Sequence, residues 1–335
     1  MSKPTLIIAE AGVNHNGRVD LALKLVDEAK RAGADAVKFQ TAIPAMVATK
    51  LAGKAAYQRR TSQPAESQLH MLERILLPLG AFREISEYCA EKGIIFFSTA
   101  FDLTSLELLE LLDQPFHKIP SGEITNLPFL RQVGRCRRPI LLSTGMCTLG
   151  EVEAAINAIE MAGTPRSMIT ALQCNTEYPT PLCDVNLKAM CTLGSAFGVQ
   201  FGYSDHTEGI DVPIAAVALG ASVVEKHLTL DREMPGPDHK ASIEPDEFSA
   251  MVRSIRRVEE ALGSSQKTPS GSELKNRLVA RRSIVALTPI KAGDLFSPLN
   301  ICAKRPGGGI SPMRWDEVIG RVATRDYLPD EQIAL

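Results

Sequence analysis

The sequence lacks the features that mark membrane, secreted and nucleic-acid-binding proteins. No stretch approaches the ~18 uninterrupted apolar residues of a transmembrane helix, and the apolar run before Glu10 is too short for a signal peptide. A net charge of −2 gives no electrostatic footprint for nucleic acid or an acidic membrane. The seven cysteines include no C-x-x-C pair, which indicates reduced thiols rather than disulfides or a zinc ribbon. We therefore expect a soluble cytoplasmic protein without a nucleic-acid or membrane partner.

What the sequence does contain is a regular alternation of short apolar runs with longer segments of helical period. The runs cover 5–12, 36–41, 94–100, 116–122, 139–145, 169–175, 199–205 and 222–230. Such alternation favours a parallel sheet, because the crossovers place helices on the faces of the sheet. Eight units in this length predict an α/β fold of the (β/α)8 TIM-barrel type, with a doubly wound open sheet as the alternative.

Most of these runs begin apolar and end polar, which favours the barrel, because barrel enzymes build their active sites at the C-terminal ends of the strands. The polar residues at these ends include Glu10, Lys38, Gln40, Thr99, Lys118, Ser121, Ser143, Asn175, Ser204, His206, Glu225 and His227. Side chains alternate with a period of two along a strand, so Lys38 and Gln40 share one face. The same holds for Ser204 with His206, and for Glu225 with His227.

Two regions depart from the repeat. The connection over 42–93 is long and contains basic and polar residues, which is typical of a functional lid, with a solvated excursion as the alternative. Residues 263–273 have the composition of a linker. We therefore predict a barrel domain over 1–262, a linker over 263–280 and a small module over 281–335.

Two histidines, in a chain that has six, end the last two runs. Neutral imidazole is a common metal ligand, and His206 and His227 on adjacent strands could share one ion. With only two protein ligands, the remaining positions would suit Lewis-acid catalysis. Spacing alone slightly favours the alternative of one core histidine and one general acid or base.

Other strand-end residues suit an anionic ligand. Lysines and hydroxyls at a barrel mouth fit a phosphate or a carboxylate, although ordinary rim polarity is the alternative for any one of them. The candidates are Lys38, Lys118, Ser121, Ser143 and Ser204. No P-loop or dinucleotide fingerprint is present.

Three further side chains allow more than one interpretation. Glu10 and Glu123 could bind a sugar hydroxyl or relay a proton, or could form structural salt bridges with the lysines. We expect Cys174 to pack in the barrel rather than act as a nucleophile, because the sequence shows no partner histidine arrangement around it.

These residues stand in recognisable motifs. The segments IIAEAGVNHNG, AVKFQT, KIPSGEITNLP, ILLSTGM, EYPTP, GYSDHTEGIDVPIAAVALGA, EKHLTLD and GPDHKAS occur in this order. Together they resemble the sialic acid synthase family. The C-terminal RRSIVA, IKAGD and KRPGGGI segments resemble the antifreeze-like domain of that family, a fold of the β-clip type.

The resemblance implies an enzyme that condenses phosphoenolpyruvate with an N-acylated mannosamine-type sugar in its open-chain form. The products would be a nine-carbon 2-keto sugar acid and phosphate, released by C–O cleavage after water attacks C2. A divalent metal, Mn2+ or Mg2+, would be required. The domain-swapped homodimer of the family is also implied.

The resemblance also implies roles for individual residues. The metal ligands would be His206 and His227, and Glu10 would lie near the reacting atoms, where it could handle protons. The residues that would bind phosphoenolpyruvate are Lys38, Thr99, Lys118, Ser121, Ser143 and Ser204. Those that would meet the sugar are Gln40, Glu123, Tyr178, Asp238 and Arg305, the last from the partner subunit.

Several motifs resemble most closely the branch of the family that makes legionaminic acid, whose acceptor is a 2,4-diacetamido-2,4,6-trideoxy-mannose. The alternative within the family is N-acetylneuraminate synthesis from N-acetylmannosamine. A metal-dependent barrel hydrolase or aldolase, acting without phosphoenolpyruvate, is a second kind of enzyme that the residues allow. A non-catalytic sugar-binding module is a third reading.

Overall fold

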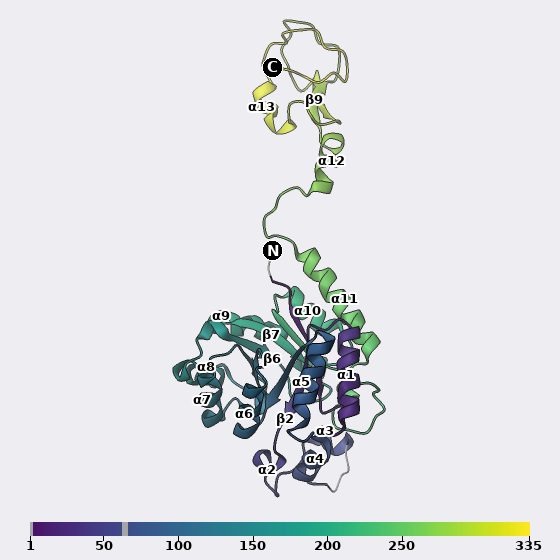
Figure 1. Ribbon diagram of the computed structural model, residues 1–335. Helices are drawn as coiled ribbons and strands as arrows, with labels where there is room; N and C mark the ends of the chain where they lie inside the picture. Colours follow the sequence, from purple (N-terminus) through teal and green to yellow (C-terminus); the bar gives the residue numbers. More distant parts are fainter. Residues whose placement is uncertain (1–2, 62–65) are drawn as a thin grey trace. The chain divides into compact units, whose positions relative to one another are not determined.

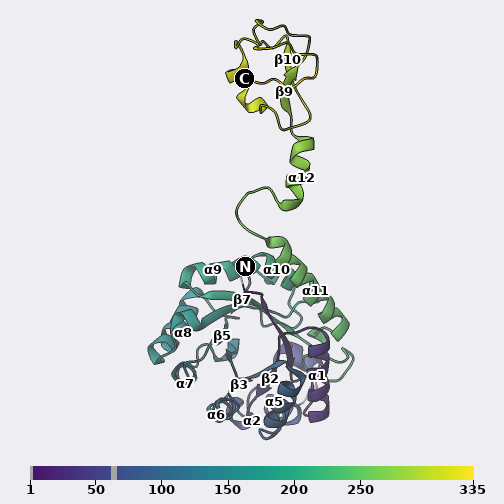
Figure 2. The same ribbon diagram turned by 45° about the horizontal axis from the view of Figure 1, so that its top comes forward.

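Eight parallel strands close into a barrel, and helices surround them as a ring (Figures 1 and 2). In this computed structural model, which describes residues 3–61 and 66–335, each predicted run contains one strand. The strands are β1 Leu6–Gly12, β2 Ala36–Thr41, β3 Ile95–Ala100, β4 His117–Ile119, β5 Ile140–Ser143, β6 Ile169–Gln173, β7 Gln200–Asp205 and β8 Val223–His227. The (β/α)8 barrel predicted from the sequence is therefore confirmed, and the open sheet is excluded.

Helices of the barrel unit connect the strands and cover their outer faces. They are α1 Val19–Arg31, α2 Pro44–Val47, α3 Ala56–Thr61, α4 Gln68–Ile75, α5 Ala81–Lys92, α6 Leu103–Leu111, α7 Leu127–Arg135, α8 Leu149–Ala162, α9 Leu187–Phe197, α10 Asp211–Ala218 and α11 Pro245–Leu262. The large hydrophobic core lies between these helices and the outward residues of the strands, such as Val37 and Phe39. Across the described parts of the chain, none of the helices has the length and apolar composition needed to cross a membrane.

The inward residues of the strands form two layers. A separate apolar cluster contains Ile8, Ala36, Phe97, Leu141, Leu172 and Val223. Five of its members precede a polar strand-end residue by two positions; for example, Ile8 precedes Glu10 and Val223 precedes Glu225. Since residues two apart share a face, the apolar cluster lies one layer deeper in the barrel than these polar residues. The barrel interior thus consists of an apolar layer beneath a polar layer.

The strand register places the polar residues side by side. Glu10 pairs with Lys38 on one side and with His227 on the other. Thr99 pairs with Lys118, and Ser204 pairs with Glu225. Residues far apart in the sequence therefore become direct neighbours around the barrel.

The long connection after β2 is folded against the barrel. Gly17 in the loop after β1 has a φ of +73°, and a Cβ at this position would lie 2.7 Å from the carbonyl oxygen of Arg74 at the end of α4. Arg74 in turn forms an ion pair with Glu66. Its Nε and Nη2 each donate to one carboxylate oxygen of Glu66 at 3.1 Å. Residues 62–65 of this connection lie outside the described part.

The C-terminal part, Ser264–Leu335, forms a second compact unit. It contains α12 Gly271–Ala280, the antiparallel pair β9 Ser283–Ala286 and β10 Ile301–Lys304, and α13 Trp315–Val318, around its own small apolar core. Helix α12 occupies the second half of the segment predicted as a linker. It begins with a capping box, in which the Ser270 side chain accepts from the backbone N–H of Glu273.

We predict that Gly17→Ala destabilises the barrel unit by about 1–3 kcal/mol, because it combines a left-handed backbone with a steric clash. The measurement is the free energy of unfolding in urea, followed by circular dichroism. Gly53→Ala is the control, since no atom of the described residues other than Gly53 and its two chain neighbours lies within 4 Å of the added Cβ. Equal stability of the two variants would contradict the packing of α4 against the loop after β1.

Candidate active site

A cavity of about 450 Å3 opens at the C-terminal ends of the barrel strands. Most of the residues predicted for the site line it: Glu10, Lys38, Gln40, Thr99, Lys118, Ser121, Ser143, Tyr178, Ser204, His206, His227 and Asp238. These residues come from β1 to β5, from β7 and β8, and from the segments that directly follow β4, β6, β7 and β8. The structure thus brings together in one place side chains that the sequence distributes over more than 200 positions.

Two lysines and two glutamates form a buried charged network at the bottom of this cavity. Lys118 Nζ donates to both carboxylate oxygens of Glu225, at 2.8 and 2.9 Å. Lys38 Nζ lies 2.9 Å from Glu10 Oε2 and 3.7 Å from Glu225 Oε1. All four side chains are at least 95% buried, so each charge depends on its neighbours for compensation.

Hydroxyl and amide groups extend the network. Lys38 Nζ donates to Thr99 Oγ1 at 3.0 Å, and Ser204 Oγ donates to Glu225 Oε1 at 3.0 Å. Gln40 Nε2 donates to Glu10 Oε1 at 3.0 Å. The carboxylates therefore hold in place the cations and hydroxyls that an anionic ligand would need.

The network shifts the pKa values of its members in different directions. Burial alone would raise the pKa of Glu225, but Lys118 and Lys38 outweigh it and lower that pKa to about 2. Burial would likewise lower the pKa of Lys38, yet the attraction of Glu10 and Glu225 raises it. For Lys118, burial and the charge of Lys38 lower the pKa despite the contact with Glu225. Burial raises the pKa of Glu10. Of the two carboxyl groups, Glu225 is thus the firmly ionised one.

The two histidines lie next to each other, with ring centroids 5.3 Å apart. His206 Nδ1 is in hydrogen-bond contact with the carbonyl oxygen of Asn175, which can only accept a hydrogen bond. Nδ1 therefore carries the proton, and Nε2 keeps its lone pair toward the cavity. Burial lowers the pKa of His206 to about 4 and that of His227 well below its usual value. Both imidazoles are consequently neutral at physiological pH.

Aromatic rings and a carboxyl group surround the histidines. Tyr178 stacks on His206, with centroids 4.0 Å apart, and its hydroxyl lies 2.9 Å from His206 Nε2. Tyr57 stacks on the same tyrosine at 4.9 Å. Asp238 Oδ2 is 3.9 Å from His227 Nδ1, and burial together with the charge of Glu10 raises the pKa of Asp238 to about 7.

These residues fit a divalent metal ion. Among the described residues, His227 Nδ1 has no hydrogen-bond partner although it is buried. His206 Nε2 has a lone pair, which accepts from the Tyr178 hydroxyl and which an ion would take over. Both rings are neutral, as metal ligation requires. The Asn175 carbonyl supplies the kind of second hydrogen bond that orients a ligating histidine. His206 and His227 are thus the side chains that would hold the ion.

Two residues from the sequence analysis, Glu123 and Arg305, are not among the described lining residues, whereas a third, Cys174, is. Glu123 is not part of the described lining; its carboxylate accepts a hydrogen bond of 2.6 Å from Asn126. Arg305 belongs to the C-terminal unit, where Nε donates to the carbonyl oxygen of Ala280 at 2.9 Å. Cys174 is buried in the cavity lining, with Sγ 3.2 Å from Ser121 Oγ.

Sequence reasoning assigned no role to Glu225, yet it connects Lys38, Lys118 and Ser204. The available signal was its spacing of two from His227, which predicts the same inward face. What the sequence did not supply was the register that brings the lysines of β2 and β4 to it. The orienting carbonyl of Asn175 gave no signal at all, because any residue can provide a main-chain oxygen.

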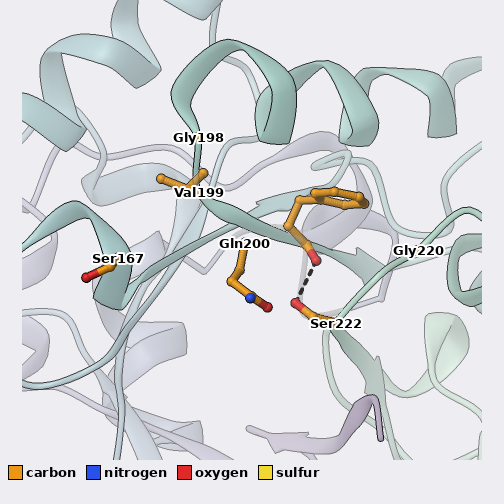
Figure 3. Close-up of a pocket in the computed structure, with 7 residues that line it drawn as sticks. Ser167, Gly198, Val199, Gln200, Gly220 and Ser222 are labelled. Carbon is orange, nitrogen blue, oxygen red and sulfur yellow. Dashed lines mark hydrogen bonds between the residues drawn. The ribbon is translucent and has the colours of Figure 1, made fainter. Parts of the chain in front are cut away.

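A second hollow, of about 410 Å3, lies at the opposite ends of β6 to β8 (Figure 3). Its lining includes Ser167, Gln200 and Ser222, and Ser222 Oγ donates to the carbonyl oxygen of Phe201 at 2.8 Å. Neutral side chains of this kind provide no charge or metal ligand. The chemistry therefore belongs to the cavity at the C-terminal ends.

Another group of potential metal ligands, Glu110, His117 and Cys136, lies outside the cavity lining, near the start of β4. Gln114 Oε1 accepts from the backbone N–H of Ser98, so its Nε2 donates to His117 Nδ1 at 3.2 Å. The proton of His117 is therefore on Nε2, 2.9 Å from Glu110 Oε1. A metal-bound histidine needs an acceptor behind it rather than a donor. We interpret this group as a structural polar network.

Comparison with known proteins gives a consistent result. Residues 25–267 match the NeuB family, and residues 281–335 match the SAF domain. The chain is 50% identical to N,N'-diacetyllegionaminic acid synthase of Campylobacter jejuni, over 99% of both chains. It is 44% identical to the Legionella pneumophila protein of the same name, over 95% of this chain and 90% of that protein.

A solved structure is also similar. N-acetylneuraminic acid synthetase from Leptospira borgpetersenii, crystallised with citrate, superposes with a TM-score of 0.71 at 33% identity. The match covers 82% of this chain and 90% of that one.

We predict that Glu225→Gln lowers the free energy of unfolding by about 3–5 kcal/mol at neutral pH, because it leaves buried lysine charge uncompensated. Inorganic phosphate should restore part of this loss by replacing the missing negative charge. Urea denaturation with and without phosphate measures both effects. Glu153→Gln, at an exposed position on α8, serves as the control. Wild-type stability of the Glu225 variant would show that the carboxylate does not support the lysines.

Proposed function

The chain belongs to the NeuB family, and from that premise we propose that it joins phosphoenolpyruvate to an open-chain N-acylated mannosamine-type sugar. C3 of phosphoenolpyruvate forms a bond to the aldehyde carbon, water adds to C2, and the C2–O bond to phosphate breaks. The products are a nine-carbon 2-keto sugar acid and inorganic phosphate. The observation that carries this proposal is the meeting of Lys38 and Lys118 with two neutral histidines in one cavity.

The lysines and strand-end hydroxyls are suited to phosphoenolpyruvate. Lys38 and Lys118 are buried beside carboxylates, so they are held in position before the ligand arrives. A phosphate or carboxylate oxygen can accept from both ammonium groups and from the nearby hydroxyls. The hydroxyl donors are Thr99, Ser121, Ser143 and Ser204.

The histidines are suited to the divalent ion, for which we propose Mn2+ or Mg2+. When bound, such an ion supplies Lewis-acid polarisation of the aldehyde oxygen. His206 and His227 would hold it as neutral ligands, and the Asn175 carbonyl fixes the tautomer of His206. Tyr178 stacks on His206 and so covers one face of its ring.

The remaining polar residues are assigned to the sugar and to proton transfer. Gln40, Tyr178 and Asp238 line the cavity around the histidines and offer hydrogen bonds to hydroxyl and acylamino groups. We assign proton handling to Glu10, because it is buried next to Lys38 and level with His227 in the strand register. We also assign Glu123 to sugar binding or catalysis, since its carboxylate, which accepts from Asn126 at Oε2, can accept further hydrogen bonds.

For the acceptor we propose the 2,4-diacetamido-2,4,6-trideoxy-mannose of legionaminic acid synthesis. The support is that relatives 50% and 44% identical over nearly the whole chain are named as N,N'-diacetyllegionaminic acid synthases. N-acetylmannosamine is the alternative acceptor. We further propose a domain-swapped homodimer, in which Arg305 of the partner subunit reaches the sugar.

For the proposed reaction, we predict that phosphate release requires phosphoenolpyruvate, the acceptor sugar and a divalent ion together. A chelator should abolish release and Mn2+ should restore it, while His227→Ala should lower kcat/KM by about 100-fold or more, since Lewis-acid assistance contributes several kcal/mol. A colorimetric phosphate assay measures the rate, and mass spectrometry identifies the product from each acceptor. Release of phosphate without sugar would contradict the proposal.

The proposed role of Arg305 can also be tested. Its replacement by alanine removes a charge-assisted contact and should raise the barrier in kcat/KM by about 1.5–3 kcal/mol. Arg314→Ala, at another exposed position of the same unit, is the matched control and should leave the kinetics unchanged. If Arg305→Ala also retains wild-type kcat/KM, the arginine takes no part in the site.

A further inference from the structure

The cavity has a polar floor and an apolar wall, and we propose that the wall selects the acceptor by holding the apolar groups farthest from its aldehyde carbon. These groups are a deoxy carbon at C6 and the methyl of an acylamino group. The inference rests on the function proposed above. We define the wall as Val13, Val47, Met71, Leu72, Ile75 and Leu76, all of which line the cavity.

The floor and the wall come from different parts of the fold. The floor residues lie at the strand ends and carry the charges and hydroxyls. The wall comes from the loop after β1 and from α2 and α4 in the connection after β2. Figure 1 shows these two helices beyond the end of β2. A ligand whose reacting carbon lies on the floor therefore extends toward the wall.

The wall is preformed rather than assembled by the ligand. Val13, Met71 and Ile75 are 1–5% exposed and form a small cluster of their own, with Leu76 packed against it. Positions 71, 72 and 75 follow helical spacing, which places them along one face of α4, and Leu76 follows as the C-cap residue of this helix. The close approach of Gly17 to Arg74, together with the ion pair between Arg74 and Glu66, anchors this helix.

Two wall residues are not explained by core packing. Leu72 is half-buried, lines the cavity and does not belong to the Val13 cluster. Val47 is 36% exposed and also faces the cavity. Apolar surface left open beside a charged floor is what a ligand with one polar and one apolar end requires.

The wall would discriminate between a methyl and a hydroxymethyl group at C6. The connection also contributes two amides to the cavity lining, those of Gln58 and Gln68. The aliphatic side chains of the wall itself offer no partner to a hydroxyl, so burying one against them costs free energy, whereas a methyl gains from leaving water. The discrimination that an apolar pocket achieves against an added hydroxyl is about 100-fold. We expect the protein to prefer the 6-deoxy sugar by about this factor in kcat/KM.

The experiment compares two acceptors that differ in one atom: 2,4-diacetamido-2,4,6-trideoxy-mannose and its 6-hydroxy counterpart, 2,4-diacetamido-2,4-dideoxy-mannose. Leu72→Asn replaces an apolar contact by an amide that can bond to a hydroxyl. The ratio of the two kcat/KM values should fall by about tenfold or more, with a smaller change in the KM for phosphoenolpyruvate. Leu51→Asn, at a leucine of the same connection that is 96% exposed, is the control and should keep the wild-type ratio.

The outcomes separate this inference from the proposed function. If the wild-type protein releases no phosphate with any acceptor, the proposed function is wrong. If it acts on both acceptors and Leu72→Asn keeps the wild-type ratio, the wall does not select the sugar. Val47→Asn, on the half-exposed part of the wall, provides the same comparison should Leu72→Asn fail to fold, and an unchanged ratio there would overturn the inference as well.

Discussion

The structure depends on the pairing of buried charges next to the apolar layer of the barrel interior. Lys38, Lys118, Glu10 and Glu225 lie directly above an apolar layer, where an unpaired charge would be costly. Their pairing is possible only because a closed barrel brings β1, β2, β4 and β8 to one rim in a fixed register. An open sheet would have separated the first strand from the last. Closure of the barrel therefore also brings the residues of the site together.

Much of this arrangement could be predicted from the order of residues. Apolar runs with polar ends indicated eight strands, and the period of two indicated which side chains face inward. Glu225 shows where such reasoning stops. Its inward face followed from its spacing to His227, but its partners did not, because strand register and barrel closure are set by contacts between distant segments. Helix α12 is a second example: its capping box lies in a segment whose overall composition resembles a linker.

The site divides its tasks between two kinds of backbone. Strand ends, held on both sides by neighbouring strands, carry the groups whose positions must be accurate, namely the lysines, the carboxylates and His227. Tyr57 of α3, together with Tyr178 and Asp238 of the loops after β6 and β8, completes the lining of the cavity. His206 lies just beyond β7 and is fixed by the main chain at Asn175, so its proton position does not depend on the side chain there.

The placement of the apolar wall has an evolutionary consequence. Nearly all of it is encoded by one continuous stretch, from Val47 to Leu76, which leaves the barrel after one strand and returns to it before the next. Insertions, deletions or exchange of this stretch by recombination would leave every strand-borne group in place. A lineage could thus change the sugar it accepts without rebuilding its catalytic machinery. Because the stretch is continuous, it can also be exchanged as a unit to engineer new acceptor preferences.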